Sequence, residues 1–135
     1  RAIRVFQAAV TPRFHPLRIA EDAATLDRLS GGRLILGLGM GYRPLEFDGF
    51  ASDKRTRGAR LVEMMELLRR ALGAERFSFP GAHSHYDDVS VQPRPVQRPH
   101  PPLWLCGGTT LAAARRAGTT APPRQASTAK ASTAA

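Results

Sequence analysis

The stretch Arg33-Leu34-Ile35-Leu36-Gly37-Leu38-Gly39 decides the fold class of this chain. After its first residue the run is apolar or glycine, with no alternation between apolar and polar side chains. A continuous apolar run of this length is expected of a strand that is covered on both faces, as in a parallel sheet. We therefore predict a buried parallel strand at this position.

A helix is predicted directly before this strand, over residues 17–29. Its apolar positions recur at helical spacing: Ile19, Ala23 and Leu26. Pro16 suits the first helical position, where its missing N–H costs nothing. Gly31-Gly32 suits the helix end, because glycine tolerates the left-handed conformation found there. Further upstream, the apolar and partly β-branched segment 1–10 predicts another buried strand, which the prolines of segment 11–16 terminate.

A second helix is predicted downstream, over residues 54–72, with Asp53 as its N-cap. One side of it carries a stripe that we assign to the core: Leu61, Met64, Met65, Leu68 and Leu72. The polar, glycine-containing stretch 40–52 that precedes it is predicted as a loop. Residues 77–91 alternate loosely around the turn signal Pro80-Gly81, which predicts a short hairpin.

Three further segments complete the pattern. Residues 92–102 are rich in proline and are predicted to be extended. A short apolar strand is predicted over 103–106, ending at Gly107-Gly108, and a helix begins within 111–117. Repeated strand–helix units imply an α/β fold with a parallel sheet and right-handed crossovers.

The composition narrows the class of protein. The chain has 135 residues, of which 42% are apolar and 23% charged, as in a soluble globular domain. No apolar run approaches the roughly 20 residues that span a bilayer, no signal peptide is evident, and the single Cys106 fits a reducing compartment. We therefore expect a cytoplasmic protein without membrane contact. The net charge of +9 is spread along the chain beside acidic residues, which does not indicate a nucleic-acid partner.

The character of the sequence changes at Thr119. Residues 119–135 contain no Leu, Ile, Val or aromatic side chain, so we expect a disordered low-complexity tail after a domain that covers 1–118. Our hypothesis is that the gene is truncated or frameshifted between Ala117 and Thr120. Sequencing of the locus tests it, and an uninterrupted reading frame on both sides would refute it.

A series of motifs runs through residues 15–108. Its strings are His15-Pro16-Leu17-Arg18-Ile19-Ala20-Glu21, Leu26-Asp27-Arg28-Leu29-Ser30-Gly31-Gly32-Arg33-Leu34, Gly37-Leu38-Gly39-Met40-Gly41-Tyr42 with Glu46-Phe47, Arg57-Gly58-Ala59-Arg60-Leu61, and Pro93-Arg94-Pro95-Val96-Gln97 continuing through Pro101-Pro102-Leu103-Trp104 to Gly107-Gly108. In order and spacing these strings resemble the luciferase-like monooxygenase family. Any one of them alone would be a weak match.

The resemblance implies a partial TIM (β/α)8 barrel that covers about strands 3 to 5 with their helices and a hairpin insertion. A complete barrel of this kind needs about 250 residues. Members of the family are oxidoreductases or monooxygenases that use FMN or coenzyme F420 on a small organic substrate. After strand 5 they continue toward a Gly-Asp-Gly-Trp-like segment, whereas Ala117-Gly118 is followed here by the predicted tail. We expect such a fragment to have little or no activity alone, and to self-associate or aggregate through its exposed edges.

The resemblance also implies where the cofactor binds, because TIM-barrel chemistry occurs at the carboxyl ends of the strands. Its candidate residues are Ala8 and Ala9 at the first strand end, Met40 and Gly41 at the second, and Gly107, Gly108 and Thr109 at the third, near the cofactor phosphate. The alternatives are a buried strand end and a glycine-rich turn without a ligand. The G-x-G-x-G spacing around Gly39 does not match a dinucleotide fingerprint. The resemblance places Glu46 in the loop beside Met40.

Other reactive side chains have plainer interpretations. His83-Ser84-His85, with Asp87 and Asp88, invites a metal site, but no third ligand follows at a recognisable spacing, so we predict a solvated hairpin and no metal. His15 is assigned to the turn before a helix, and Cys106 to a small buried hydrophobe. No paired general acid and base is evident, and the catalytic residues stay unknown. Two alternatives to a flavin-dependent enzyme remain open: an inactive barrel remnant that acts only by association with a partner, and a small basic binding module.

Overall fold

The computed structural model describes residues 5–10 and 15–106, with side chains for residues 15–105. The elements follow the order β1 (Val5–Val10), α1 (Pro16–Leu29), β2 (Leu34–Gly39), α2 (Pro44–Gly49), a 3-10 turn (Lys54–Thr56), α3 (Arg57–Gly73), β3 (Phe77–Pro80), β4 (His85–Val89) and β5 (Leu103–Cys106). The predicted helix over 111–117 and the predicted tail over 119–135 lie outside the described residues.

A three-stranded parallel sheet, in the order β1-β2-β5, carries the fold. The central strand β2 is the strand predicted from the apolar run Leu34–Gly39, and its residues 34–38 are all buried. Both of its edges are paired and one face lies under the helices, which explains its continuous apolar sequence. The predicted α/β class with a parallel sheet is confirmed. The described strands form an open sheet and do not close into a barrel.

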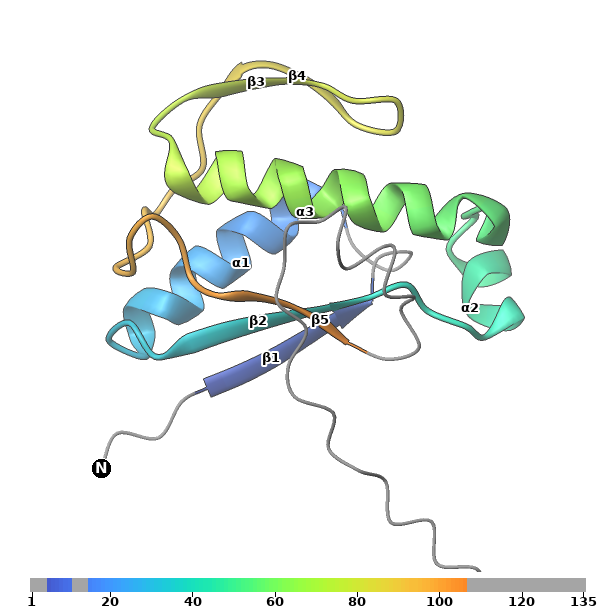
Figure 1. Ribbon diagram of the computed structural model, residues 1–135, viewed down its shortest axis with the longest axis horizontal. Helices are drawn as coiled ribbons and strands as arrows, with labels where there is room; N and C mark the ends of the chain where they lie inside the picture. Colours follow the sequence, from blue (N-terminus) through green and yellow to red (C-terminus); the bar gives the residue numbers. More distant parts are fainter. Residues whose placement is uncertain (1–4, 11–14, 107–135) are drawn as a thin grey trace, which may run out of the picture.

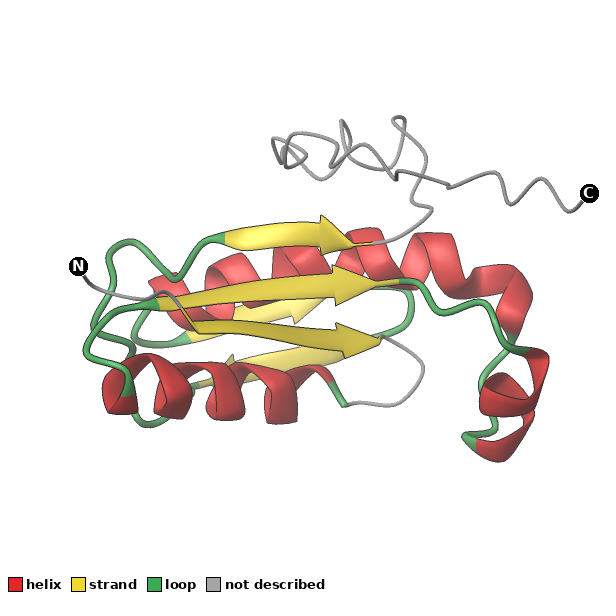
Figure 2. Cartoon of the chain, turned by 90° about the horizontal axis from the view of Figure 1, so that it is seen from below, coloured by secondary structure: helices red, strands yellow, loops and turns green. Residues whose placement is uncertain are grey.

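The molecule is layered on one side of this sheet. Figure 1 shows α1 and α3 between the sheet and the β3–β4 hairpin, and Figure 2 shows the strands from the direction below. The core between the layers includes Leu34, Leu36 and Leu38 of β2. The stripe predicted on the second helix is buried there, with exposures of 0% at Leu61, Met65 and Leu68 and 5% at Met64.

The ends of α1 lie where the sequence predicts them. Pro16 occupies the first turn, and the chain after Ser30 adopts positive φ at Gly31 (+63°) and Gly32 (+77°). The N–H of Gly32 donates to the carbonyl of Asp27 at 2.8 Å. A side chain at either glycine would be strained, so these two residues end the helix and turn the chain directly into β2.

The segment between β2 and α3 corrects the predicted loop. Residues 44–49 form the short helix α2, and Glu46 lies in its first turn instead of in a loop. Pro44 suits the first turn, Glu46 complements the helix dipole, and Phe47 anchors the helix with 2% exposure. A helix of this length is too short to show a helical repeat of apolar residues in the sequence. The one residue that could have indicated it is the buried Phe47.

The remaining local predictions are confirmed with small shifts. The carboxylate of Asp53 accepts from the N–H of Arg55 at 2.9 Å, but the turn that it caps is 3-10, and α3 begins at Arg57. β3 and β4 form the predicted antiparallel hairpin, and the N–H of Gly81 donates to the carbonyl of Ser84 at 2.9 Å in its turn. The segment 92–102 contains neither helix nor strand.

Candidate functional site

The carboxyl ends of the three parallel strands meet at one edge. Gly39 of β2 is in register with Val10 of β1 on one side and with Cys106 of β5 on the other. Met40 and Gly41 therefore leave the sheet at this edge, beside the point where residues 107–109 begin. The topology brings the three predicted strand ends together, which the sequence order alone did not guarantee.

Ala8 and Ala9 lie just inside this edge. Ala8 is in register with Gly37, two steps before the end of β1, and Ala9 is in register with Leu38, one step before it. Gly107, Gly108 and Thr109 follow Cys106 in the chain but lie outside the described residues. A cofactor contact at any of these residues stays a prediction.

Met40 and Gly41 form the described part of the edge. Met40 is half-buried and packs partly against the helical core, with its sulfur close to Gly58 in the first turn of α3. Gly41 has a φ of +75°, a conformation that side chains disfavour. The predicted use of glycine for an unusual backbone conformation is confirmed at Gly41, while contact with a cofactor is untested at both positions.

Arg57 is a residue of this edge that the sequence analysis did not single out as a site residue. Its Nη1 donates to the carbonyl oxygen of Gly41 at 3.3 Å, across 16 positions in the sequence. The bond places a guanidinium beside the glycine turn. One sequence feature could have identified Arg57: it lies at the basic start of a predicted helix that follows a glycine-rich strand end. A cation at a helix start beside such a turn is well placed to bind an anion.

The face of the sheet away from the helices is lined differently from the core face. Because Leu34, Leu36 and Leu38 point to the helical core, the intervening Ile35, Gly37 and Gly39 lie on the opposite face. Trp104 is in register with Gly37 and alternates with core residues Leu103 and Leu105. This face therefore combines apolar side chains with glycines. Ile35 and Gly37 are buried on it, and Gly39 at its carboxyl end is half-buried.

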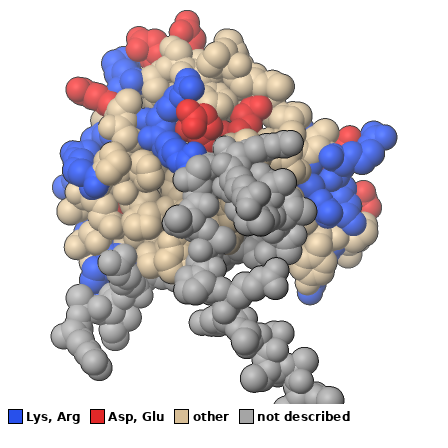
Figure 3. Space-filling model, in the orientation of Figure 1, with Lys and Arg blue, Asp and Glu red and all other residues tan. Residues whose placement is uncertain are grey.

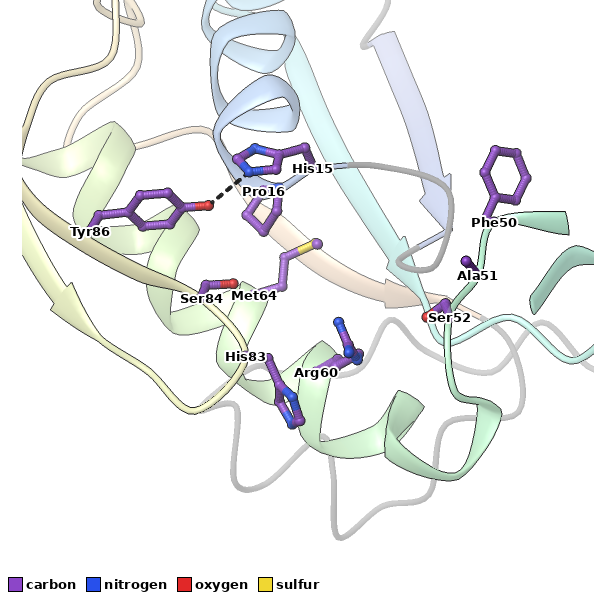
Figure 4. A pocket seen from close by; sticks show the side chains of 10 residues that line it. All are labelled: His15, Pro16, Phe50, Ala51, Ser52, Arg60, Met64, His83, Ser84 and Tyr86. Atoms are coloured by element: carbon purple, nitrogen blue, oxygen red, sulfur yellow. Dashed lines mark hydrogen bonds between the residues drawn. The ribbon is translucent and has the colours of Figure 1, made fainter. Parts of the chain in front are cut away.

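A separate pocket of about 230 Å³ lies on the helical side of the molecule. It is enclosed by the start of α1, the segment after α2, α3 and the hairpin turn, and its lining includes His15, Ser52, Arg60, His83 and Tyr86 (Figure 4). The hydroxyl of Tyr86 and Nε2 of His15 form a hydrogen bond of 3.3 Å. Burial raises the pKa of the Tyr86 phenol, so it stays protonated at neutral pH.

The histidines of the hairpin do not form a pair on a strand. His83 lies in the turn and lines the pocket, whereas His85 begins β4. In the described part of the chain, no group of three or more His, Cys, Asp or Glu side chains could hold a metal ion. His15 precedes α1 as predicted, but its side chain does not cap the helix and bonds to Tyr86 instead. Within residues 5–10 and 15–106, no helix has the length and apolar character needed to cross a membrane.

Known proteins resemble this chain over most of its length. It is 42% identical over 91 residues to the uncharacterized protein y4wF of Sinorhizobium fredii. The matched residues make up 67% of this chain and 27% of that protein. The monooxygenase RslO1 from Streptomyces bottropensis has a TM-score of 0.80 and 34% identity, over 88% of this chain and 37% of that one. The chain thus spans less than two fifths of the length of these relatives.

Two further solved structures are of proteins that are described together with a cofactor. The coenzyme F420 dependent tetrahydromethanopterin reductase from Methanopyrus kandleri has a TM-score of 0.71 and 25% identity, over 88% of this chain and 38% of that chain. Riboflavin lyase (RcaE), solved with modified FMN and riboflavin, has a TM-score of 0.75 and 16% identity, over 89% of this chain and 32% of that one, and shows a shared fold. The predicted choice between FMN and F420 agrees with the cofactors named for these two proteins.

The family model for luciferase-like monooxygenases matches residues 1–132, nearly the whole chain. The resemblance drawn from the motifs of residues 15–108 is therefore confirmed: this chain belongs to the luciferase-like monooxygenase family.

Proposed function

We propose that this chain is part of an FMN- or F420-dependent oxidoreductase or monooxygenase that acts on a small organic substrate. It supplies about strands 3 to 5 of a TIM barrel, as β1, β2 and β5, with β3 and β4 as an inserted hairpin. The parallel order of the strands and their shared carboxyl edge support this placement.

The observation that carries the proposal is that the carboxyl ends of β1, β2 and β5 lie in register at one edge. Of the predicted residues, Ala8 and Ala9 lie two and one steps inside this edge on β1, Met40 and Gly41 follow the end of β2, and Gly107, Gly108 and Thr109 follow Cys106 in the sequence. In a barrel the chemistry takes place at this edge. The positive φ of Gly41 and the half-buried Gly39 at the end of β2 fit a bound planar group, because glycine permits close approach to the backbone.

The residues of the edge would bind and orient the cofactor. Gly39, half-buried at the end of β2, would present bare backbone toward its ring, and Met40 would contact the ring from the adjoining turn. Arg57, held by the carbonyl of Gly41, would place positive charge near an anionic part of the cofactor. When bound, the cofactor supplies the redox chemistry, while the protein supplies position and electrostatics. We assign no catalytic acid or base to the described residues.

We further propose that the 135-residue chain alone has little or no activity. The described sheet has three strands, so the outer edges of β1 and β5 lack the neighbours that a closed barrel provides. The division into a domain over 1–118 and a tail over 119–135 stays a prediction.

Titration of the purified chain with FMN and with F420, followed by fluorescence, tests the cofactor site. Saturable micromolar binding, weakened by Gly41→Val and unchanged by Gly49→Ala, supports the proposed edge. Gly49 is a suitable control because a side chain there would meet no atom within 4 Å. If the chain is folded by circular dichroism and binds neither FMN nor F420, a cofactor site in this part of the barrel is refuted.

The two alternative functions predict different behaviour. An inactive remnant that acts by association would elute as a complex or aggregate in size-exclusion chromatography, and a sharp monomer peak would argue against it. A basic binding module would show salt-dependent binding to DNA or RNA. On the face in Figure 3, Lys and Arg side chains lie in separate groups beside acidic ones, which does not favour a nucleic-acid surface.

A further inference from the structure

The pocket between the helices and the hairpin has a basic lining. Arg60 of α3, His15 at the start of α1 and His83 in the hairpin turn all border it, together with the hydroxyl groups of Ser52 and Ser84 (Figure 4). No acidic residue is among the described residues that line it. We refer to it as the helix–hairpin pocket. Neither Met40 nor Gly41 contributes to it, so it is separate from the described part of the proposed cofactor edge.

Local hydrogen bonds hold the Arg60 guanidinium and the backbone of the hairpin turn at His83. Nε of Arg60 donates to Oγ1 of Thr56, one turn earlier, at 2.9 Å. The backbone N–H of His83 donates to the carboxylate of Glu63 at 3.0 Å, and the N–H of Ala82 donates to the same carboxylate at 3.0 Å. Glu63 thereby fixes the hairpin turn to α3, and its negative charge is engaged by these amides.

The Tyr86 phenol adds a donor to the pocket. Its raised pKa keeps the O–H group intact at neutral pH. When Nε2 of His15 carries a hydrogen, it donates to the Tyr86 oxygen across their 3.3 Å contact, and the Tyr86 O–H can then donate to another group.

The start of α1 contributes in the same direction. Its first turn has no acidic residue and no side-chain cap, so no carboxylate neutralises the positive end of its dipole. Figure 4 shows His15 and Pro16 of this turn at the pocket, facing Tyr86 and Met64.

We propose that the helix–hairpin pocket binds a small oxyanion of the phosphate class, with Arg60, His83 and Tyr86 as its principal donors. The pocket volume of about 230 Å³ is below the roughly 300–1,000 Å³ of sites for drug-sized ligands, which favours a small ion or a single phosphoryl group over a whole cofactor. An arginine accompanied by other N–H and O–H donors is a combination that recognises phosphate.

The test is a titration of the full 135-residue chain with sodium phosphate at constant pH, followed by the ring resonances of His15 and His83 in NMR spectra. Sodium chloride at matched ionic strength is the reference. We expect saturable shifts with phosphate alone. Arg60→Gln should weaken binding about tenfold or more, because a hydrogen bond to a charged group is lost. Arg70→Gln, on the same helix and paired with Glu66 outside the pocket, should leave it unchanged.

A second titration uses methyl phosphate. Equal shifts with methyl phosphate and inorganic phosphate would indicate that the pocket accepts a phosphoryl group on an organic molecule, and shifts with inorganic phosphate alone would indicate the free ion. Either result supports the site.

Equal shifts with phosphate and chloride, or equal phosphate affinity in wild type and Arg60→Gln, would overturn the proposal. If Arg60→Gln loses its fold by circular dichroism, His83→Ala replaces it, because this exposed turn residue contributes little to the core. No flavin is present in these titrations, so their outcome is independent of the proposed cofactor edge.

Discussion

The side-chain amide of Gln97 donates to the buried carboxylate of Asp27 at 2.7 Å, joining residues 70 positions apart. Asp27 is fully buried, and it also accepts from the backbone N–H groups of Val96 and Gln97, each at 2.8 Å. The Gln97 amide donates in addition to the carbonyl of Leu34, at the start of β2, at 2.9 Å. One side chain thus connects the end of α1, the beginning of β2 and the segment that leads to β5.

These hydrogen bonds show that the motif of residues 26–34 has a structural role. It lies at the amino end of β2, opposite the edge where Met40 and Gly41 leave the sheet. In TIM barrels the amino-terminal face contributes stability and the carboxyl-terminal face contributes chemistry. The most recognisable motif of the chain therefore braces the fold and lies away from the proposed cofactor.

Asp27→Asn should lower the free energy of unfolding by about 2–4 kcal/mol, because only one oxygen would remain as an acceptor, and with that oxygen bound to the backbone N–H groups the new NH2 would face the NH2 of Gln97. Urea denaturation followed by circular dichroism measures the change. Asp22→Asn is the matched control on the same helix, since its exposed pair with Arg18 is worth at most about 1 kcal/mol. Similar losses in both variants would contradict the bracing role of Asp27.

Gly41→Ala should cost about 1–2 kcal/mol of stability, because a side chain at φ +75° is strained. Its effect on FMN or F420 affinity should be larger than that of Gly49→Ala, which changes a position with open space. Thermal unfolding and fluorescence titration on the same samples separate the two effects. Wild-type stability in Gly41→Ala would mean that the turn relaxes without cost.

Glu63→Gln should loosen the hairpin turn by about 1 kcal/mol, because the charged acceptor for the amides of Ala82 and His83 becomes neutral. Hydrogen exchange at these two amides should become faster, while exchange in the sheet stays unchanged. Glu66→Gln, also on α3, removes an exposed pair with Arg70 and should leave both amides protected. Unaltered exchange in Glu63→Gln would argue that the hairpin is held by its apolar contacts alone.

The Arg76–Asp88 pair should make the hairpin sensitive to acid. Hydrogen bonds from the Arg76 guanidinium, at 2.7 and 2.8 Å, lower the pKa of the Asp88 carboxyl. A carboxyl whose pKa is lowered by folding stabilises the fold above its unfolded pKa of about 3.9, and this contribution is lost as the pH falls through the lower folded value. In Arg76→Gln the pKa of Asp88 should rise toward its ordinary value, as measured by NMR titration of the carboxyl carbon.

Arg76→Lys is the control for this prediction. It keeps the positive charge but not the two-pronged geometry, so the pKa of Asp88 should lie between those of wild type and Arg76→Gln. Identical titration of Asp88 in all three proteins would show that the pair does not persist in solution.

Part of the candidate site was predictable from the sequence. Gly41 was identified because glycine at a strand end permits unusual backbone conformations, and its φ is indeed positive. Arg57 was not singled out, since its bond to Gly41 depends on how the chain turns between β2 and α3. The His15–Tyr86 contact joins residues 71 positions apart, and no local pattern signals such a pair.

The elements with local causes were predictable from the amino-acid sequence. The apolar run of 34–38 required a buried strand, Pro16 started a helix, and Gly31-Gly32 ended it, because each acts through its own backbone or its near neighbours. Three other features arise from tertiary packing: the helix α2 around Phe47, the hydrogen bond between Asp27 and Gln97, and the basic pocket between the helices and the hairpin. Those features depend on burial and on contacts between distant segments, whose energies exist only once the layers have packed.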